Sequence, residues 1–157
     1  MRIGQGSDAH RLVAGRPLVL GGVTVPHDRG LEGHSDGDAL LHAVASAVLG
    51  ALGDGDLGTH FPSSDPDLAG IASREILARV MQRARDRGFA LGNLDATIVA
   101  EEPRLGPHLP AMREAIAKCL GAPPERVNVK VTSTDGLGAI GRGDGIAAQA
   151  VVLLERA

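Results

Sequence analysis

The sequence has almost no aromatic residues and only one cysteine. Among 157 residues there are two Phe, no Tyr and no Trp, so any core must be built from aliphatic side chains. Cys119 has no second cysteine with which to pair. This excludes a disulfide within the chain and is typical of proteins from a reducing compartment.

Long apolar runs and an excess of basic charge are also missing. No apolar stretch reaches the roughly 18 residues that a membrane span needs, and residues 1–4 show no signal-peptide pattern. Sixteen basic residues stand against nineteen acidic ones, which gives a net charge of −3. A nucleic-acid platform would show a basic face and stacking aromatic residues. We therefore expect a soluble cytoplasmic protein with no nucleic-acid or membrane partner.

The chain length and the apolar pattern predict one domain over residues 1–157. Alternating and helical periodicities give the element order β-β-α-α-β-α-β-β. Such an order is typical of an α+β single-domain sandwich, in which helices pack on one face of one mixed β-sheet. The expected strands cover residues 2–12, 16–25, 94–100, 127–132 and 146–154, and the expected helices cover about 38–52, 71–87 and 107–120.

The start of the first helix carries a capping pattern, because Ser35 is followed three residues later by Asp38. His42 lies about 140° around this helix from the middle of its apolar stripe. We therefore predict that His42 does not face the core. Asp38 lies one turn earlier on the same side, where it is expected to orient or screen the imidazole.

A candidate metal site combines the start of the chain with this helix. Asp8 and His10 are two residues apart, so both side chains leave the same face of a strand. With His42 they offer three nitrogen and oxygen ligands, which leave a fourth position open as in catalytic zinc sites. The alternative is that Asp8 and His10 are polar residues at a strand end. His34 is either a competing ligand or an anion contact, whereas the other histidines are expected at the surface: His27, His60 and His108.

A glycine-rich segment over residues 136–141 matches G-x-G-x-x-G but lacks the context of a dinucleotide-binding fold. Only sixteen residues follow it, and they alternate like a strand where that fold needs a helix. A phosphate-binding role is favoured, with hydroxyl groups at 132–134, backbone N–H groups and Arg142 as donors. Asp135 fits that site if Mg²⁺ or Mn²⁺ lies between its carboxylate and the phosphate.

Taken together, these motifs resemble the 2-C-methyl-D-erythritol 2,4-cyclodiphosphate synthases, a family of the non-mevalonate isoprenoid pathway. The resemblance covers the whole chain and rests on many motifs in a fixed order. They are Arg2-Ile3-Gly4, Asp8-x-His10, Leu20-Gly21-Gly22-Val23, His34-Ser35-Asp36-Gly37-Asp38 with His42, Gly55-Asp56-Leu57-Gly58, Phe61-Pro62, Asp65-Pro66, Gly92-Asn93-Leu94-Asp95, Pro107-His108-Leu109-Pro110, Val127-Asn128-Val129-Lys130 and Gly141-Arg142-Gly143-Asp144-Gly145-Ile146-Ala147.

The resemblance implies a lyase that cyclises a cytidine diphosphate ester of methylerythritol 2-phosphate and releases CMP. It implies a homotrimer with active sites between neighbouring subunits. Zinc would be held by Asp8, His10 and His42, and Mg²⁺ or Mn²⁺ would bind at Asp135. His34 and Ser133 match positions credited with transition-state stabilisation.

The resemblance also implies two groups of substrate-binding residues. The methylerythritol phosphate would be held by Asp56, Leu57, Gly58, Phe61, Pro62, Ser63, Ser64 and Asp65. The cytidine diphosphate would be held by Ala100, Glu101, Glu102, Pro103, Arg104, Leu105, Gly106, Thr132, Ser133, Thr134 and Asp135. The expected substrate-binding set also includes Asp8, Ala9, His10, His34, Ser35, Ala139 and Arg142.

Several positions depart from the family pattern. Gln5 and Ser7 replace a commoner His and aromatic residue, outside the ligand set. Ser63 stands where an Asp usually contacts the erythritol hydroxyls. Asp135 replaces a usual Glu, and its side chain is shorter than that of Glu. Ala139 replaces a usual Phe, so the apolar lining where subunits meet is expected to be emptier.

Two other functions remain open at the level of sequence. A metal-dependent phosphohydrolase would use the same ligands with a zinc-bound water as nucleophile. A non-catalytic trimer would bind a nucleotide or an isoprenoid at the subunit junction. Product analysis separates these possibilities, because hydrolysis adds one water and the non-catalytic trimer gives no turnover.

Overall fold

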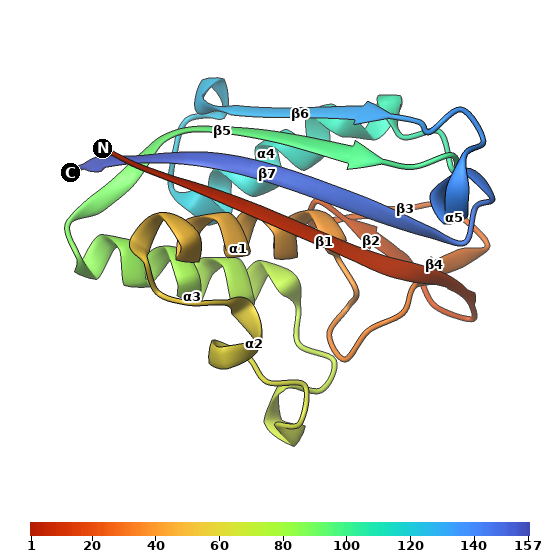
Figure 1. Cartoon of the computed structure of the whole chain (residues 1–157), viewed down its shortest axis with the longest axis horizontal. Helices are drawn as coiled ribbons and strands as arrows, with labels where there is room; N and C mark the ends of the chain where they lie inside the picture. The colour runs from red at the N-terminus through yellow and green to blue at the C-terminus, as the bar shows by residue number, and fades with distance from the viewer.

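The computed structural model describes all residues from Met1 to Ala157 and shows a five-stranded mixed sheet with helices on one face (Figure 1). The strand order is β4-β1-β7-β5-β6. Only β5 and β6 run parallel, and the other neighbours are antiparallel. The strands of this sheet are β1 (Arg2–Ala14), β4 (Arg29–Leu31), β5 (Phe89–Val99), β6 (Val127–Thr132) and β7 (Gly145–Arg156).

The burial of alternate residues shows which face of the sheet carries the helices. In β7, Ala148, Ala150 and Val152 are buried, whereas Gln149 and Val151 between them are exposed. Three long helices cover the buried face: α1 (Ala39–Leu52), α3 (Ser73–Asp86) and α4 (Leu109–Leu120). Helix α1 packs on β1 and β7, α4 packs on β6, and α3 contacts both helices. The predicted one-sided sandwich of a mixed sheet and helices is confirmed.

The stretch 16–25, in which the sequence predicts a turn or bulge at Gly21-Gly22, is divided into two strands at these glycines. Strands β2 (Leu18–Leu20) and β3 (Val23–Val25) form a separate two-stranded sheet. Gly21 and Gly22 both have positive φ, +61° and +73°, the conformation that two-residue hairpin turns require. The hairpin turn is anchored on the start of α1, because Asp38 accepts hydrogen bonds from both glycine N–H groups at 2.9 and 2.7 Å.

Asp38 itself is the N-cap of α1, so the predicted cap at Ser35 is wrong. Its carboxylate accepts from the Leu41 N–H at 3.0 Å. The predicted contact between Asp38 and His42 is also wrong, because the carboxylate is fully buried against the hairpin turn. Helix α1 buries twelve of its fourteen residues, His42 among them. His42 nevertheless lines a cavity instead of the hydrophobic core, in agreement with the prediction, and it lies on the side of α1 that carries the partly exposed Ser46 and the exposed Gly50.

Two regions expected to be loops contain short elements. Strand β4 lies within residues 26–37 and pairs with Leu12–Ala14 of β1. Residues 53–67 include the four-residue helix α2 (Leu57–His60) and the start of the 3₁₀ turn Pro66–Leu68. Further 3₁₀ turns cover Gly106–His108 and Pro124–Arg126, and a one-turn helix α5 covers Gly138–Gly141. The short α5 agrees with the rejection of a dinucleotide-binding fold, which needs a longer helix there.

No helix in the structure has both the length and the apolar character required to cross a lipid bilayer.

Strand β1 and helix α1 approach each other so closely that only glycine fits on the strand. A Cβ atom on Gly6 would lie 2.1 Å from the Ala43 carbonyl oxygen and 2.6 Å from the Ala47 nitrogen. Gly4 is equally close to the next helical turn. This contact places the following strand residues, Asp8 and His10, beside the helical turn that carries His42.

We expect Gly6→Ala to destabilise the protein by about 3 kcal/mol or more, because backbone atoms of a packed helix cannot move aside for a methyl group. Denaturant unfolding of the metal-free protein measures the effect. Gly50→Ala is the control, because a Cβ there would meet nothing closer than 3.5 Å. In a helix interior that change should raise stability by up to about 1 kcal/mol. Equal stability of the two variants would contradict the close packing.

Candidate metal centre

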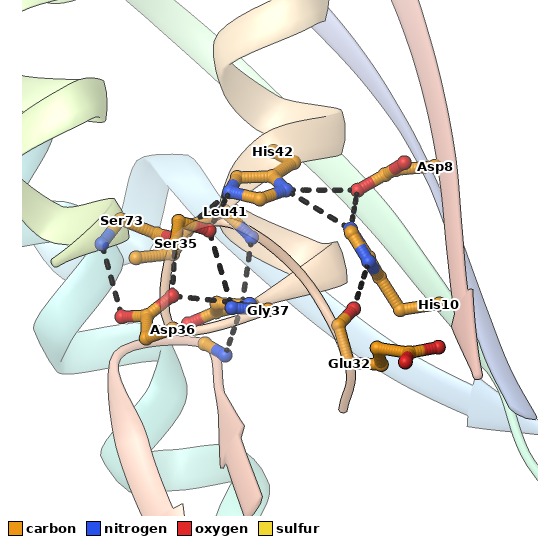
Figure 2. Close-up of polar contacts among 11 residues, drawn as sticks. Asp8, His10, Glu32, Ser35, Asp36, Gly37, Leu41, His42 and Ser73 are labelled. Atoms are coloured by element: carbon orange, nitrogen blue, oxygen red, sulfur yellow. Dashed lines mark hydrogen bonds and ion pairs between the residues drawn. The ribbon is translucent and has the colours of Figure 1, made fainter. Parts of the chain in front are cut away.

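Three side chains from β1 and α1 point their ligand atoms at one another (Figure 2). His10 Nε2 lies 2.7 Å from Asp8 Oδ2, and His42 Nδ1 lies 2.9 Å from the same oxygen. The two ring nitrogens are 3.2 Å apart. The structure contains one group of three or more His, Cys, Asp or Glu residues that could hold a metal ion, and it is this triad.

The backbone fixes the orientation of His10. Its Nδ1 lies 2.6 Å from the Glu32 carbonyl oxygen, which can only accept a hydrogen bond. The neutral ring therefore carries its proton on Nδ1, which leaves a lone pair on Nε2 for a cation. Histidine ligands are commonly oriented in this way by a hydrogen bond from their other nitrogen.

The charges in the triad favour an ionised carboxylate. Burial opposes ionisation of Asp8, but the hydrogen bonds from His10 and His42 outweigh it and lower its pKa to about 2. The hydrogen bond to Asp8 in turn raises the pKa of His10 above its ordinary 6.5, against the opposing effect of burial. In the metal-free protein, a protonated His10 thus neutralises part of the negative charge of Asp8. A bound cation would take over this role.

The donor set and its geometry fit a divalent cation with an open coordination position. Two imidazole nitrogens and one carboxylate oxygen are borne by two elements packed against each other. Such three-ligand sets are typical of catalytic zinc sites, in which the fourth position takes water or substrate. Asp8, His10 and His42 would therefore hold the ion, and the ion would provide a positive charge at the edge of the adjoining cavity.

Zinc affinity should fall as the pH is lowered from about 8 to about 6, because His10 must lose a proton before its Nε2 can bind. Since its pKa is raised, the loss should begin above the ordinary histidine value and approach about tenfold per pH unit. Competition with a chromophoric chelator of known pH dependence measures this affinity. An affinity that stays constant over the interval would contradict the placement of His10 in the ligand set.

A cavity of about 400 Å³ opens directly onto the triad. Of the predicted substrate-binding residues, it is lined by His34, Ser35, Leu57, Gly58, Phe61 and Ser63 in addition to the triad. Leu68, Ile71 and Ile76 complete the wall. Sequence reasoning missed the last three as site residues, because an apolar residue of a pocket wall has the same pattern as one in the core.

The remaining predicted residues of this region shape the cavity from outside. The Asp56 carboxylate caps α2 and accepts from the Thr59 N–H at 2.8 Å. Asp65 caps the following 3₁₀ turn, and its carbonyl oxygen lies 3.0 Å from His34 Nε2. Pro62 and Ser64 lie between these caps and do not line the cavity. His60 is only partly exposed, with its Nε2 2.7 Å from the Asp54 carbonyl oxygen, rather than a free surface residue.

The predicted phosphate-binding turn is not part of the cavity at the triad. Thr132, Ser133, Thr134 and Asp135 line neither that cavity nor either of the two other main depressions. Ser133 Oγ donates to Asp135 Oδ1 at 3.2 Å, and Asp135 has a positive φ of 53°. A single chain therefore holds these two side chains together but does not bring them to the metal ligands.

Glu101 organises this turn. Its carboxylate accepts from the Thr134 N–H at 2.8 Å, from the Thr134 hydroxyl at 3.1 Å and from the Gly136 N–H at 3.3 Å. These hydrogen bonds lower the pKa of Glu101. Two of the donors predicted to hold a phosphate, the Thr134 hydroxyl and the Gly136 N–H, are thus already paired with Glu101, so this turn is not a free phosphate cradle.

The segment 100–106 lies apart from the triad as well, whereas Ala139 and Arg142 share a separate depression with His10. Ala100 and Leu105 are buried, so only their backbone could meet a ligand. Ala9, Ala139 and Arg142 line a second depression of about 360 Å³, together with the other edge of His10. The other residues of the segment lie outside both depressions: Glu101, Glu102, Pro103, Arg104 and Gly106.

Comparisons with known proteins agree with this arrangement. The YgbB family model matches residues 1–155. A curated relative, the 2-C-methyl-D-erythritol 2,4-cyclodiphosphate synthase of Geobacter sulfurreducens, is 61% identical over 155 residues, 99% of each chain. The bifunctional IspDF from Campylobacter jejuni has a TM-score of 0.95 at 39% identity over 99% of this chain, which corresponds to 42% of that longer protein. A 2C-methyl-D-erythritol-2,4-cyclodiphosphate synthase solved in its CDP-bound form has a TM-score of 0.90 at 38% identity, covering 98% of this chain and 100% of its own.

Proposed function

The chain belongs to the YgbB family, and from this membership we propose that the Asp8, His10 and His42 site serves the cyclisation that gives these synthases their name. The function is that of a 2-C-methyl-D-erythritol 2,4-cyclodiphosphate synthase in isoprenoid precursor biosynthesis. The observation that carries the proposal is the convergence of three ligand atoms at the mouth of a cavity large enough for a small phosphorylated polyol.

The reaction joins the two ends of one substrate, 4-diphosphocytidyl-2-C-methyl-D-erythritol 2-phosphate. An oxygen of the 2-phosphate attacks the β-phosphorus, and the bond between that phosphorus and the bridging oxygen to the α-phosphorus breaks. CMP leaves with the bridging oxygen and its electron pair. Because the nucleophile is already an anion, no general base is required, which is consistent with a cavity that contains no carboxylate besides Asp8.

The protein must bring two anionic groups together and keep water away from the phosphorus. A zinc ion held by the triad would polarise the β-phosphate and neutralise developing charge. His34 faces the same cavity and is held by the Asp65 carbonyl, so it can donate toward the transferred group once that contact opens. Leu57, Phe61 and Ile71 give an apolar wall that limits the access of water. Orientation of the two ends can supply about 7–11 kcal/mol of the barrier reduction.

The cytidine diphosphate would be held by segments 100–106 and 132–135 of a neighbouring subunit in a homotrimer. Two features support this assignment. These segments do not reach the metal cavity of their own chain, and the sheet face opposite the helices leaves large apolar side chains exposed, including Ile3 at 73% and Val151 at 48%. Asp135 would bind Mg²⁺ or Mn²⁺ at this junction, with Ser133 beside it.

Mass analysis of the product tests the function directly. The purified protein is incubated with the cytidylyl substrate, Zn²⁺ and Mg²⁺, and we expect the cyclic diphosphate and CMP in equal amounts. A linear product heavier by one water would indicate a hydrolase, and no product at all would indicate a binding protein. Either result would overturn the proposed reaction.

A further inference from the structure

The ring nitrogen of His42 that faces away from the triad has its own polar partners (Figure 2). His42 Nε2 lies 2.9 Å from Ser73 Oγ and 3.1 Å from Ser35 Oγ. Ser73 is the first residue of α3 and is completely buried. Water therefore cannot replace its hydroxyl group at this nitrogen.

Asp36 determines the direction of these hydrogen bonds. The Ser73 hydroxyl lies in hydrogen-bond contact with Asp36 Oδ1, and the Ser73 N–H donates to Asp36 Oδ2 at 2.9 Å. A carboxylate can only accept, so the Ser73 hydroxyl proton is directed to Asp36. The remaining lone pairs of Ser73 Oγ can then only accept from His42. When a cation occupies Nδ1, the proton of the neutral imidazole is therefore placed on Nε2; without the cation, the Asp8 carboxylate 2.9 Å from Nδ1 competes for that proton.

We propose that Asp36 and Ser73 are positioning residues that hold His42 in the tautomer whose Nδ1 can bind the catalytic cation. The inference depends on the proposed function only for the identity of that cation. It makes His42 the counterpart of His10, whose far nitrogen is oriented by the Glu32 carbonyl. Each imidazole of the triad thus has an obligate acceptor behind it, one from the backbone and one relayed through a hydroxyl.

Ser35 cannot provide this selection by itself. Its hydroxyl oxygen accepts from the Gly37 N–H at 3.2 Å, but no carboxylate takes its proton. That proton can rotate toward His42 Nε2, which would favour the wrong tautomer. The Asp36 carboxylate, in contrast, is held in place by the Ser73 N–H and by the Asp38 N–H at 3.1 Å.

A pair of equal-sized substitutions separates hydrogen bonding from packing. Ser73→Thr keeps the hydroxyl, whereas Ser73→Val replaces it with a methyl group of similar shape. Asp36→Asn tests the relay without touching His42: its amide can donate to Ser73 Oγ, which turns the hydroxyl proton toward Nε2. Glu75→Gln is the matched control for Asp36→Asn, because it also removes one negative charge. Glu75 lies in the first turn of α3, the turn that Ser73 begins.

We expect zinc affinity, measured by chelator competition, to be about 10- to 100-fold weaker in Ser73→Val and Asp36→Asn. Ser73→Thr should stay within about threefold of the unsubstituted protein, and Glu75→Gln should not change it. Nitrogen chemical shifts of His42 in the metal-free protein give a second readout. The fraction of rings with the proton on Nδ1 should be larger in Asp36→Asn than in Glu75→Gln.

Equal zinc affinity of Ser73→Val and Ser73→Thr, or of Asp36→Asn and Glu75→Gln, would overturn the relay. If Ser73→Val does not fold, the Asp36→Asn comparison and the tautomer readout decide. The product assay of the unsubstituted protein is independent of these measurements. A protein that binds zinc through the relay but forms no cyclic diphosphate would keep this inference and lose the proposed reaction.

Discussion

His42→Ala should abolish zinc retention and cyclase turnover together. The substitution removes one of three ligand atoms at the metal centre and leaves Asp8 and His10 on a single strand. Two ligands that leave one side of the ion open to water bind zinc far more weakly than three ligands do. Because several kcal/mol of transition-state charge stabilisation depend on the bound ion, we expect turnover to fall by at least about three orders of magnitude. Metal analysis after dialysis and the product assay measure the two effects in one preparation.

A control is needed because His42 is buried and its loss leaves a cavity. His108→Ala removes an imidazole at the start of α4 that lies outside the triad and its cavity, so zinc content and turnover should remain. Thermal unfolding of both variants in a chelator separates loss of metal from loss of fold. A folded His42→Ala protein that kept one zinc per chain and full turnover would refute the ligand assignment.

Periodic patterns predicted the long elements because those elements are stabilised by repeating contacts with one core. The alternation in residues 146–154 and the helical stripe in 71–87 both correspond to observed elements, β7 and α3, within a few residues. Strand β4 has only three residues and pairs with the far end of β1, so no local pattern could indicate it. The hairpin at Gly21–Gly22 shows the same limit: the glycines indicated a turn, but not that both flanking strands leave the main sheet.

The candidate metal centre was predictable to the extent that it follows from strand geometry. The spacing of Asp8 and His10 places both on one face, but the approach of α1 depends on the absence of side chains at Gly4 and Gly6. The helical pattern around His42 offered this residue as the third ligand, and the resemblance to a known family agreed with it. The contacts of Ser73 with His42 and Asp36 join residues 31 and 37 positions apart, and neither Asp36 nor Ser73 has a sequence signal other than a turn or a helix start. Such partners become visible only when the fold is known.

The same separation explains why the second half of the predicted site could not be placed in one chain. Ser133 and Asp135 lie together at the end of β6, stabilised by the turn that Glu101 holds. The triad lies on β1 and α1, and the cavity between them and α3 contains none of the 132–135 residues. Sequence motifs identify both halves but carry no information on whether one chain or two bring them together.

Mixing two inactive variants should restore activity if a complete site requires two subunits. His42→Ala lacks the metal half, and the double variant Ser133→Ala/Asp135→Ala lacks the phosphate half. In mixed trimers, a junction is complete when its metal half comes from the double variant and its phosphate half comes from His42→Ala. In every mixed trimer one of the three junctions is complete, so the turnover of isolated mixed trimers should recover to about a third of the unsubstituted value.

Two tags, one on each variant, allow only mixed oligomers to be isolated for the assay. The matched control mixes His42→Ala with Asp8→Ala, which both lack the metal half, so that no arrangement of subunits rebuilds a site. Recovery in the first mixture and none in the second is expected from a site shared between neighbours. Mixed oligomers that stay as inactive as their parents would mean that Ser133 and Asp135 act within their own chain, and segment 132–135 would then have to move to the metal cavity during turnover. That alternative requires the hydrogen bonds from Thr134 and Gly136 to Glu101 to break, whereas the shared site leaves them intact.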